Sequence, residues 1–130
     1  MGSVKWLDEA QGVILLRFDD SDSMDQILAD YAQFAAMITS APSKTYTIVD
    51  FLELKSMPGH AISRFPQFAR LTPPKNRSEV IALVSQRSFI TMVTEIFAKV
   101  YPDFRDRFVY FSTVQEAQAF IEQRIREAAG

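Results

Sequence analysis

Residues 80–111 read VIALVSQRSFITMVTEIFAKVYPDFRDRFVYF and have the pattern of a strand, a helix and a second strand. Residues 80–84 and 108–111 are short, continuous apolar runs, as expected of buried strands. Between them, apolar residues recur at helical spacing after Ser88, which we expect to cap the helix, and Pro102 ends it. Apolar strands joined by a helix are typical of a parallel sheet that is covered by helices.

The same alternation extends toward the amino terminus. Residues 4–7 and 13–18 are apolar runs joined by a polar loop that ends in glycine, which predicts a β-hairpin. A helix is expected from Met24 to Ile38, because its apolar residues follow helical spacing and capping residues precede it. Pro42 closes this helix.

Three further elements complete the pattern. Residues 46–49 are predicted as a buried strand, and a short helix is expected to break or restart near Phe65 because Pro66 lacks an N–H group. Ser112 is expected to cap the last helix, with Gln115 as its capping-box partner. The predicted order is β-β-α-β-α-β-α-β-α, an α/β fold with a mixed, mostly parallel five-stranded sheet, an N-terminal hairpin and about four helices. Five residues should lie almost wholly buried in central strands, namely Ile48, Val49, Ala82, Leu83 and Val109.

The composition is that of one domain. A length of 130 residues is close to the common domain size, so residues 1–130 are predicted to form a single domain. Residues 1–3 have the composition of a cloning remnant, and we leave them out of the functional interpretation. The chain has no cysteine, which excludes disulfides, a thiolate nucleophile and cysteine-based metal sites.

Charge and hydropathy exclude two classes of partner. The net charge of -2 and the isoelectric point near 5.4 argue against general nucleic-acid binding, which needs a strongly basic face. No apolar run approaches the ~20 residues of a membrane helix. The amino terminus does not have the pattern of a signal peptide. We therefore expect a cytoplasmic protein that binds neither nucleic acid nor membrane.

Two parts of the chain resemble a known family. The first is the predicted strand with its acidic end, residues 48–54, and the second comprises residues 81–84, the helix 88–101, and residues 108–117 with their Glu116-Ala117 step. These patterns are similar to those of uncharacterised bacterial SpoIIAA-like proteins, relatives of the STAS domains (sulfate transporter and anti-sigma-factor antagonist). The resemblance implies a SpoIIAA-like fold and a regulatory binding role.

In the anti-sigma-factor antagonists, the loop after the Asp-bearing strand presents a phosphorylatable serine, usually within Asp-Ser-Ser-Gly. The corresponding loop here reads Ser56-Met57-Pro58-Gly59 and has no acid beside the serine. Gly59 or His60 lies nearer the expected phosphoacceptor position than Ser56 does. We therefore do not assign a phosphorylation site from the resemblance.

Residue types with catalytic or metal-binding chemistry occur in patterns that favour structural roles. Asp19, Asp20, Asp22 and Asp25 lack the spacing of a calcium loop and are expected to stabilise a helix N-terminus. The four glycines are dispersed, so no phosphate-cradling loop and no cofactor are predicted. No catalytic or metal-binding residue is assigned.

Residues 54–78 contain no acid but several bases and large apolar residues, which suits an anion or an acidic partner as well as a solvated face. Phe65 is expected in the core, whereas Phe68 is compatible with either the core or an interface. The predicted binding surface comprises Asp50, Ser56, Met57, His60, Arg64, Phe68, Arg70, Lys75 and Arg77.

These observations predict a non-enzymatic domain that binds a regulatory protein partner or a small ligand. Two alternatives stay open: a carrier-type pocket for an apolar or anionic small molecule, and a hydrolase that uses His60 with Ser56 or Ser63 and Asp50. A homodimer is also expected, partly through residues 57–68, because prolines in this segment prevent one long buried helix and leave apolar side chains at the surface.

Overall fold

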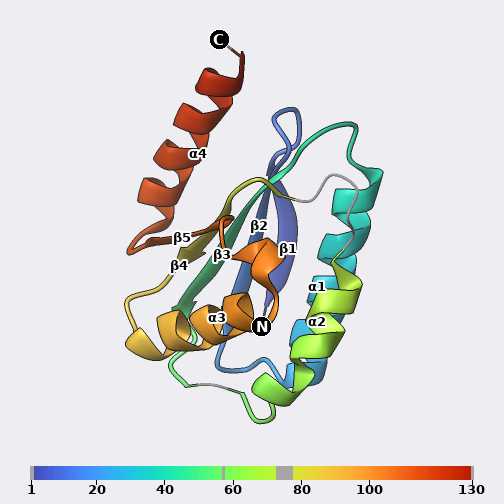
Figure 1. The fold of residues 1–130 in the computed structure, drawn as a ribbon, viewed down its shortest axis with the longest axis vertical. Coiled ribbons are helices and arrows are strands. Elements are labelled where there is room, and N and C mark those ends of the chain that lie inside the picture. Colours follow the sequence, from blue (N-terminus) through green and yellow to red (C-terminus); the bar gives the residue numbers. More distant parts are fainter. Residues whose placement is uncertain (1, 57, 73–77, 130) are drawn as a thin grey trace.

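The computed structural model describes residues 2–56, 58–72 and 78–129. These residues form five strands, four α-helices and two short 3-10 helices (Figure 1). In chain order the elements are β1 (Ser3–Asp8), β2 (Val13–Asp19), α1 (Met24–Ser40), β3 (Tyr46–Glu53), η1 (Ile62–Arg64), α2 (Phe65–Leu71), β4 (Ile81–Val84), α3 (Ser88–Val100), η2 (Pro102–Phe104), β5 (Phe108–Phe111) and α4 (Val114–Ala129). The predicted α/β class, the order of strands and helices, and the N-terminal hairpin are confirmed.

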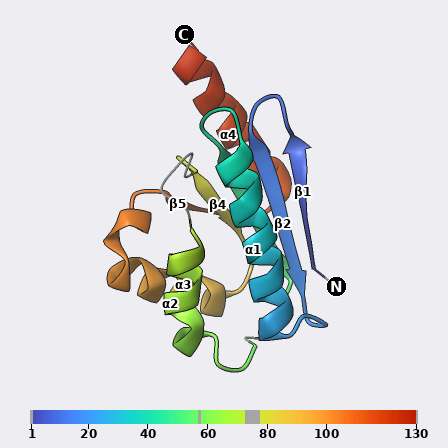
Figure 2. The same cartoon turned by 90° about the vertical axis from the view of Figure 1, so that its right-hand side faces the viewer.

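The five strands lie side by side in their chain order, β1-β2-β3-β4-β5. β1 is antiparallel to β2, and every other pair of neighbours is parallel. Because each parallel strand is added on the same side of the previous one, right-handed crossovers place α1, α2 and α3 on one face of the sheet. α4 follows the last strand and packs against β3, β4 and β5, away from the other three helices (Figures 1 and 2).

The sheet therefore has a core on each face. On the face of α1, strand β2 contributes Ile14, Leu16 and Phe18 to a buried cluster with Ile27 and Phe34. The opposite face is covered by α4, whose buried residues pack on alternate residues of β2, β3 and β4. Since β2 is covered on both faces, its sequence reads as a continuous apolar run rather than an alternating one.

The burial prediction is correct for three of its five residues. Ile48, Ala82 and Leu83 are buried, whereas Val49 and Val109 are only partly buried, so the prediction was wrong for these two. Val109 lies in β5, which is an edge strand and not a central one. Val49 lies in the central strand β3 but lines a cavity beneath the helices.

Two of the three predicted helix starts shift by one residue. Ser23 caps α1 as expected, in a reciprocal capping box. Ser88 is the first residue of α3 and not its cap. At α4 the hydroxyl of Thr113 accepts the N–H of Glu116, so the capping interaction lies one residue later than the predicted Ser112 pair.

An ion pair with a buried carboxylate joins β2 to β3. The carboxylate of Asp50 accepts a hydrogen bond from Arg17 Nε at 2.9 Å and another from the N–H of Leu52 at 2.9 Å. The side chain of Asp50 is 6 % exposed and that of Arg17 is 45 % exposed, so the carboxylate has given up much more water than the guanidinium. Asp50 shares its face of β3 with Ile48, on the α4 side of the sheet.

Replacing Arg17 should therefore destabilise the fold. Arg17→Met keeps an apolar stem but leaves the buried carboxylate without its charged donor, and we expect a loss of about 1–3 kcal/mol in the free energy of unfolding. Urea denaturation of native and variant protein measures this difference.

The matched control is Lys44→Met. Lys44 pairs with Glu79 at 2.8 Å, but both side chains are well exposed and no measurable loss is expected. Equal effects of the two substitutions would contradict a structural role for the Arg17–Asp50 pair.

Candidate functional site

The described residues of the predicted binding surface do not all lie on the same side of the sheet. Asp50 lies buried on the α4 side of the sheet, bound to Arg17. Ser56, His60 and Arg70 are exposed. Met57, Lys75 and Arg77 lie outside the described residues.

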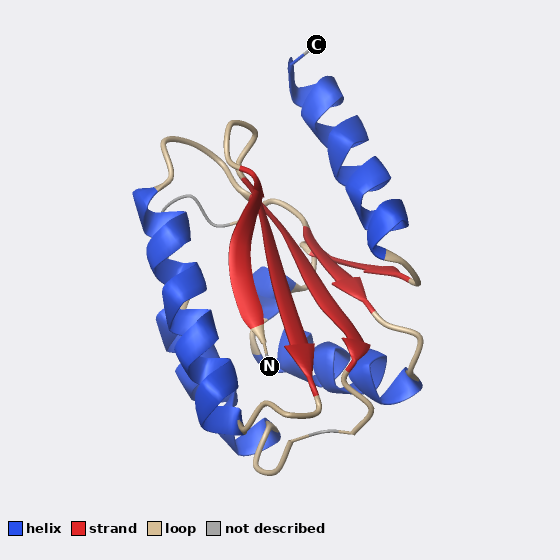
Figure 3. Ribbon diagram, turned by 180° about the vertical axis from the view of Figure 1, so that it is seen from behind, coloured by secondary structure: helices blue, strands red, loops and turns tan. Residues whose placement is uncertain are grey.

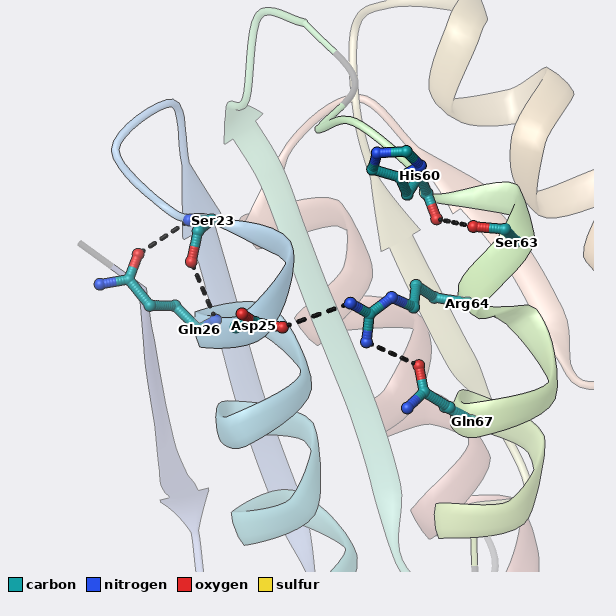
Figure 4. A network of polar contacts seen from close by, with 7 residues as sticks. All are labelled: Ser23, Asp25, Gln26, His60, Ser63, Arg64 and Gln67. Atoms are coloured by element: carbon teal, nitrogen blue, oxygen red, sulfur yellow. Dashed lines mark hydrogen bonds and ion pairs between the residues drawn. The ribbon is translucent and has the colours of Figure 1, made fainter.

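Arg64 has a structural role at the junction of two helices. Its guanidinium donates to Gln67 Oε1 at 2.9 Å and reaches Asp25 on α1 at 3.5 Å (Figure 4). These contacts hold the start of α2 against the start of α1. Within the described residues, the basic segment is therefore partly used for packing helices together.

The hypothetical Ser/His/Asp group is not brought together. Ser63 Oγ donates to the main-chain oxygen of His60 at 2.9 Å, and this contact does not involve the imidazole (Figure 4). His60 has a positive φ of 65° and lies exposed in the loop before η1. Asp50 is engaged on the other face of the sheet. The geometry thus gives no support to a hydrolase built on these residues.

The aspartates at the end of β2 and in the turn before α1 accept hydrogen bonds from main-chain N–H groups, most of them within the same turn. Asp19 accepts the N–H of Ser21 and Asp22 accepts the N–H of Asp19, at 2.8 and 2.9 Å. Asp20 accepts the N–H of Lys55 at 2.7 Å and ties the turn to the end of β3. In the described parts of the chain, no group of three or more His, Cys, Asp or Glu side chains is arranged to hold a metal ion.

The most distinctive feature of the fold is an apolar cavity of about 180 Å³ between the sheet and the helices α1, α2 and α3. Its floor is one face of four parallel strands. Its roof is the inner side of α1, α2 and α3 together with η2, and the loop after β3 closes one end. Figures 2 and 3 show these three helices grouped on this side of the sheet, with α4 apart from them.

Aromatic rings dominate the cavity wall. The rings that line it are Phe18, Tyr31, Phe34, Phe51, Phe65, Phe68, Phe97, Phe104 and Phe108. They form edge-to-face contacts on two sides: Tyr31 meets Phe68 at 5.0 Å between ring centres, and Phe65 meets Phe97 at 5.1 Å. Phe68, which the sequence left between core and interface, is half-buried in this wall.

The few polar groups of the wall are already hydrogen bonded. The hydroxyl of Tyr31 is bonded to that of Thr72, and the hydroxyl of Thr47 to that of Ser78. Thr94 Oγ1 donates to a main-chain oxygen and contacts the hydroxyl of Tyr110 at 2.8 Å. Burial raises the pKa of Tyr110, so this hydroxyl keeps its proton at neutral pH.

Charge is absent from this wall. Among the described residues, no charged side chain lines the cavity, and no buried side-chain nitrogen or oxygen lacks a hydrogen-bond partner. No side chain of the described wall therefore needs a hydrogen bond or an opposite charge from a ligand.

The local sequence explains why this space stays open. Pro66 restarts the chain as α2, which has only seven residues, against seventeen in α1. A helix of this length covers only ~10 Å of the sheet. α2 packs against α1, and it meets α3 through the rings of Phe65 and Phe97. Over the middle of the sheet, α1 and α3 are therefore separated by a short helix, and aromatic side chains make the contacts there.

Comparison of the chain with protein families, with curated proteins and with solved structures finds no match. The resemblance to SpoIIAA-like proteins stays a prediction. In the part of the chain that the structure describes, no helix combines the length and the apolar character needed to cross a membrane.

The contacts of the acidic turn predict its response to calcium. Because carboxylate oxygens of Asp19, Asp20 and Asp22 already accept main-chain N–H groups, millimolar calcium should leave the melting temperature unchanged. A site filled at a hundred times its dissociation constant would add about 2.7 kcal/mol of stability. Thermal denaturation with calcium, and with magnesium at equal ionic strength, tests this. An increase specific to calcium would establish a metal site here.

Proposed function

We propose that this chain is a non-enzymatic binding domain whose ligand is a small, uncharged, apolar molecule held between the sheet and the helices α1, α2 and α3. The observation that carries this proposal is the cavity wall, which is apolar, free of charged side chains in the described residues and complete in its hydrogen bonds. Concave apolar pockets are the usual sites of small-molecule binding. Of the two ligand types considered from the sequence, this wall favours an apolar molecule over an anionic one.

The driving force would be the removal of ligand and wall surface from water. An apolar space of roughly 150 Å³ inside a protein stays dry and binds benzene-sized molecules. The cavity here is of comparable size, about 180 Å³. A charged ligand would lose its hydration without gaining a partner, which is a large penalty in an apolar environment.

A panel of paired compounds tests this function. Neutral toluene and hexane should raise the melting temperature, whereas benzoate and hexanoate should not, because only the neutral members enter without losing a charged group's hydration. Differential scanning fluorimetry measures the shifts, and native mass spectrometry of the purified protein reports any retained ligand.

Two valine variants localise the effect. Val49→Phe fills the cavity from the central strand and should abolish the shifts, whereas Val109→Phe adds the same group on the α4 side and should preserve them. Native protein that responds to none of the neutral compounds would overturn the proposed function. So would equal responses of the Val49→Phe variant and native protein.

A second candidate function, self-association, is favoured by exposed apolar residues beside the cavity. Met92 and Val100 on α3 are 56 % and 58 % exposed, and Ile62 on η1 is 56 % exposed. Ile62 precedes Phe65 by one turn, and Phe65 packs on Phe97 of α3, so η1 lies near α3. Among the described residues of the segment 57–68, Ile62 is an exposed apolar side chain of the kind expected there, and the outer side of α3 exposes Met92 and Val100.

We propose that a second copy of the chain covers this side. Glu95 and Lys99 are exposed on α3, one turn apart. A two-fold axis perpendicular to α3 would set the two copies of this helix antiparallel, bring Glu95 of one copy near Lys99 of the other and make the surface complementary to itself in charge.

Light scattering at micromolar concentration tests the dimer. The native chain should have the mass of a dimer, and Met92→Glu should have that of a monomer because it places a charge in the apolar contact. Ala36→Glu, an exposed change on α1, is the control and should remain dimeric. A monomeric native chain would overturn self-association, and a dimeric Met92→Glu variant would exclude α3 as the interface.

A further inference from the structure

We infer that the ligand of this cavity is a molecule with a single aromatic ring, rather than an aliphatic chain of similar apolar content. This inference rests on the proposed binding function and adds the chemical class of the ligand. It follows from the arrangement of the rings in the wall, the volume between them and the polar groups around them.

The rings surround the cavity from separate elements. Phe97 on α3 is the centre of one group: it meets Phe65 edge-on and also contacts Phe104 at 5.1 Å and Phe108 at 6.3 Å. Tyr31 and Phe68 form a second group where α1 meets α2. An aromatic ligand between these groups can offer its positive edge to one ring face and its own negative face to another ring's edge. An aliphatic ligand of the same size makes only dispersion contacts.

A third ring pair lies at the carboxyl ends of the strands. Phe18 of β2 and Phe51 of β3 are 6.0 Å apart between ring centres, and both line the cavity. With Phe97 and Phe68 on the helices, rings therefore border the space from the sheet side and from the roof. A ring placed between them has aromatic neighbours in several directions, whichever way it lies.

The volume sets the size of the ligand. About 180 Å³ exceeds the roughly 150 Å³ that accommodates benzene by only a small group. The ligand that fits within this volume is thus one ring with a short apolar substituent, and a second fused ring or a long acyl chain would extend beyond the cavity. The hydroxyls of Tyr31, Thr47 and Thr94 are already hydrogen bonded, so no buried hydroxyl of this wall depends on a polar substituent of the ligand for a partner.

Calorimetric titration of the full chain with toluene and with methylcyclohexane separates ring chemistry from size, because the two molecules have the same carbon skeleton. Toluene should bind about 2- to 12-fold more tightly, the difference expected if it gains one aromatic pair beyond the burial of apolar area.

Phe97→Leu tests whether the protein's rings cause this preference. It removes the central ring but keeps an apolar side chain, so the preference for toluene over methylcyclohexane should become smaller, while the other rings of the wall remain. Phe120→Leu is the control: Phe120 packs on Phe111 at 5.3 Å on the α4 side and does not line the cavity, so the preference should persist.

The outcomes distinguish the two proposals. If toluene and methylcyclohexane bind native protein equally, the aromatic class is overturned while the apolar binding function stands. If neither compound binds, the binding function itself fails. A preference for toluene that is undiminished in folded Phe97→Leu would overturn the role of the Phe97 group. Should that variant fail to fold, the comparison of the two ligands on native protein still decides the ligand class.

Discussion

The sequential order of the strands places every crossover helix on the same face of the sheet, and both cores of the protein follow from this constraint. Three helices must share the face over β2, β3 and β4, whereas the other face is left for α4 alone. The helices cannot cover the shared face uniformly, because the middle crossover contains α2, which has only seven residues and begins at Phe65-Pro66. The cavity is the space that remains where this short helix stands between two longer ones.

The two faces consequently have different physical roles. On the α4 side, Val13, Leu15, Ile48 and Ala117 form a tightly buried cluster, and the Arg17–Asp50 pair links two strands at its edge. Close packing of this kind supplies most of the hydrophobic stability that a small domain has. The α1 side has comparable apolar material, but part of it faces empty space instead of other side chains. Half-buried Val49, in the centre of the sheet, marks this difference most clearly.

The fold could be predicted from the sequence because it depends on local patterns. Apolar runs with β-branched residues, helical spacing after Ser23, and the breaks at Pro42 and Pro66 are each readable within a few positions. The shifted cap at Thr113 shows the limit of such reading: serine and threonine are neighbours there, and their geometry decides which of them caps. The edge position of Val109 likewise depends on which strand ends the sheet, and periodicity does not contain that information.

The cavity could not be predicted in the same way, because its wall is assembled from four strands, three helices and a loop. Each of its rings taken singly, such as Phe65 or Phe97, has the signature of an ordinary core residue. The candidate surface was instead drawn from basic and apolar residues in one segment together with Asp50, and β-strand alternation turns Asp50 to the opposite face of the sheet.

One signal in the sequence was informative about the cavity, namely eleven phenylalanines in 130 residues. Methionine, with three rotatable bonds, is the side chain that fills irregular gaps in a core, and of the methionines among the described residues only Met24 lines this cavity. The wall is made largely of rings, which keep tilted and edge-to-face contacts with one another. These rings also define, by their faces and edges, which molecule would fill the space best.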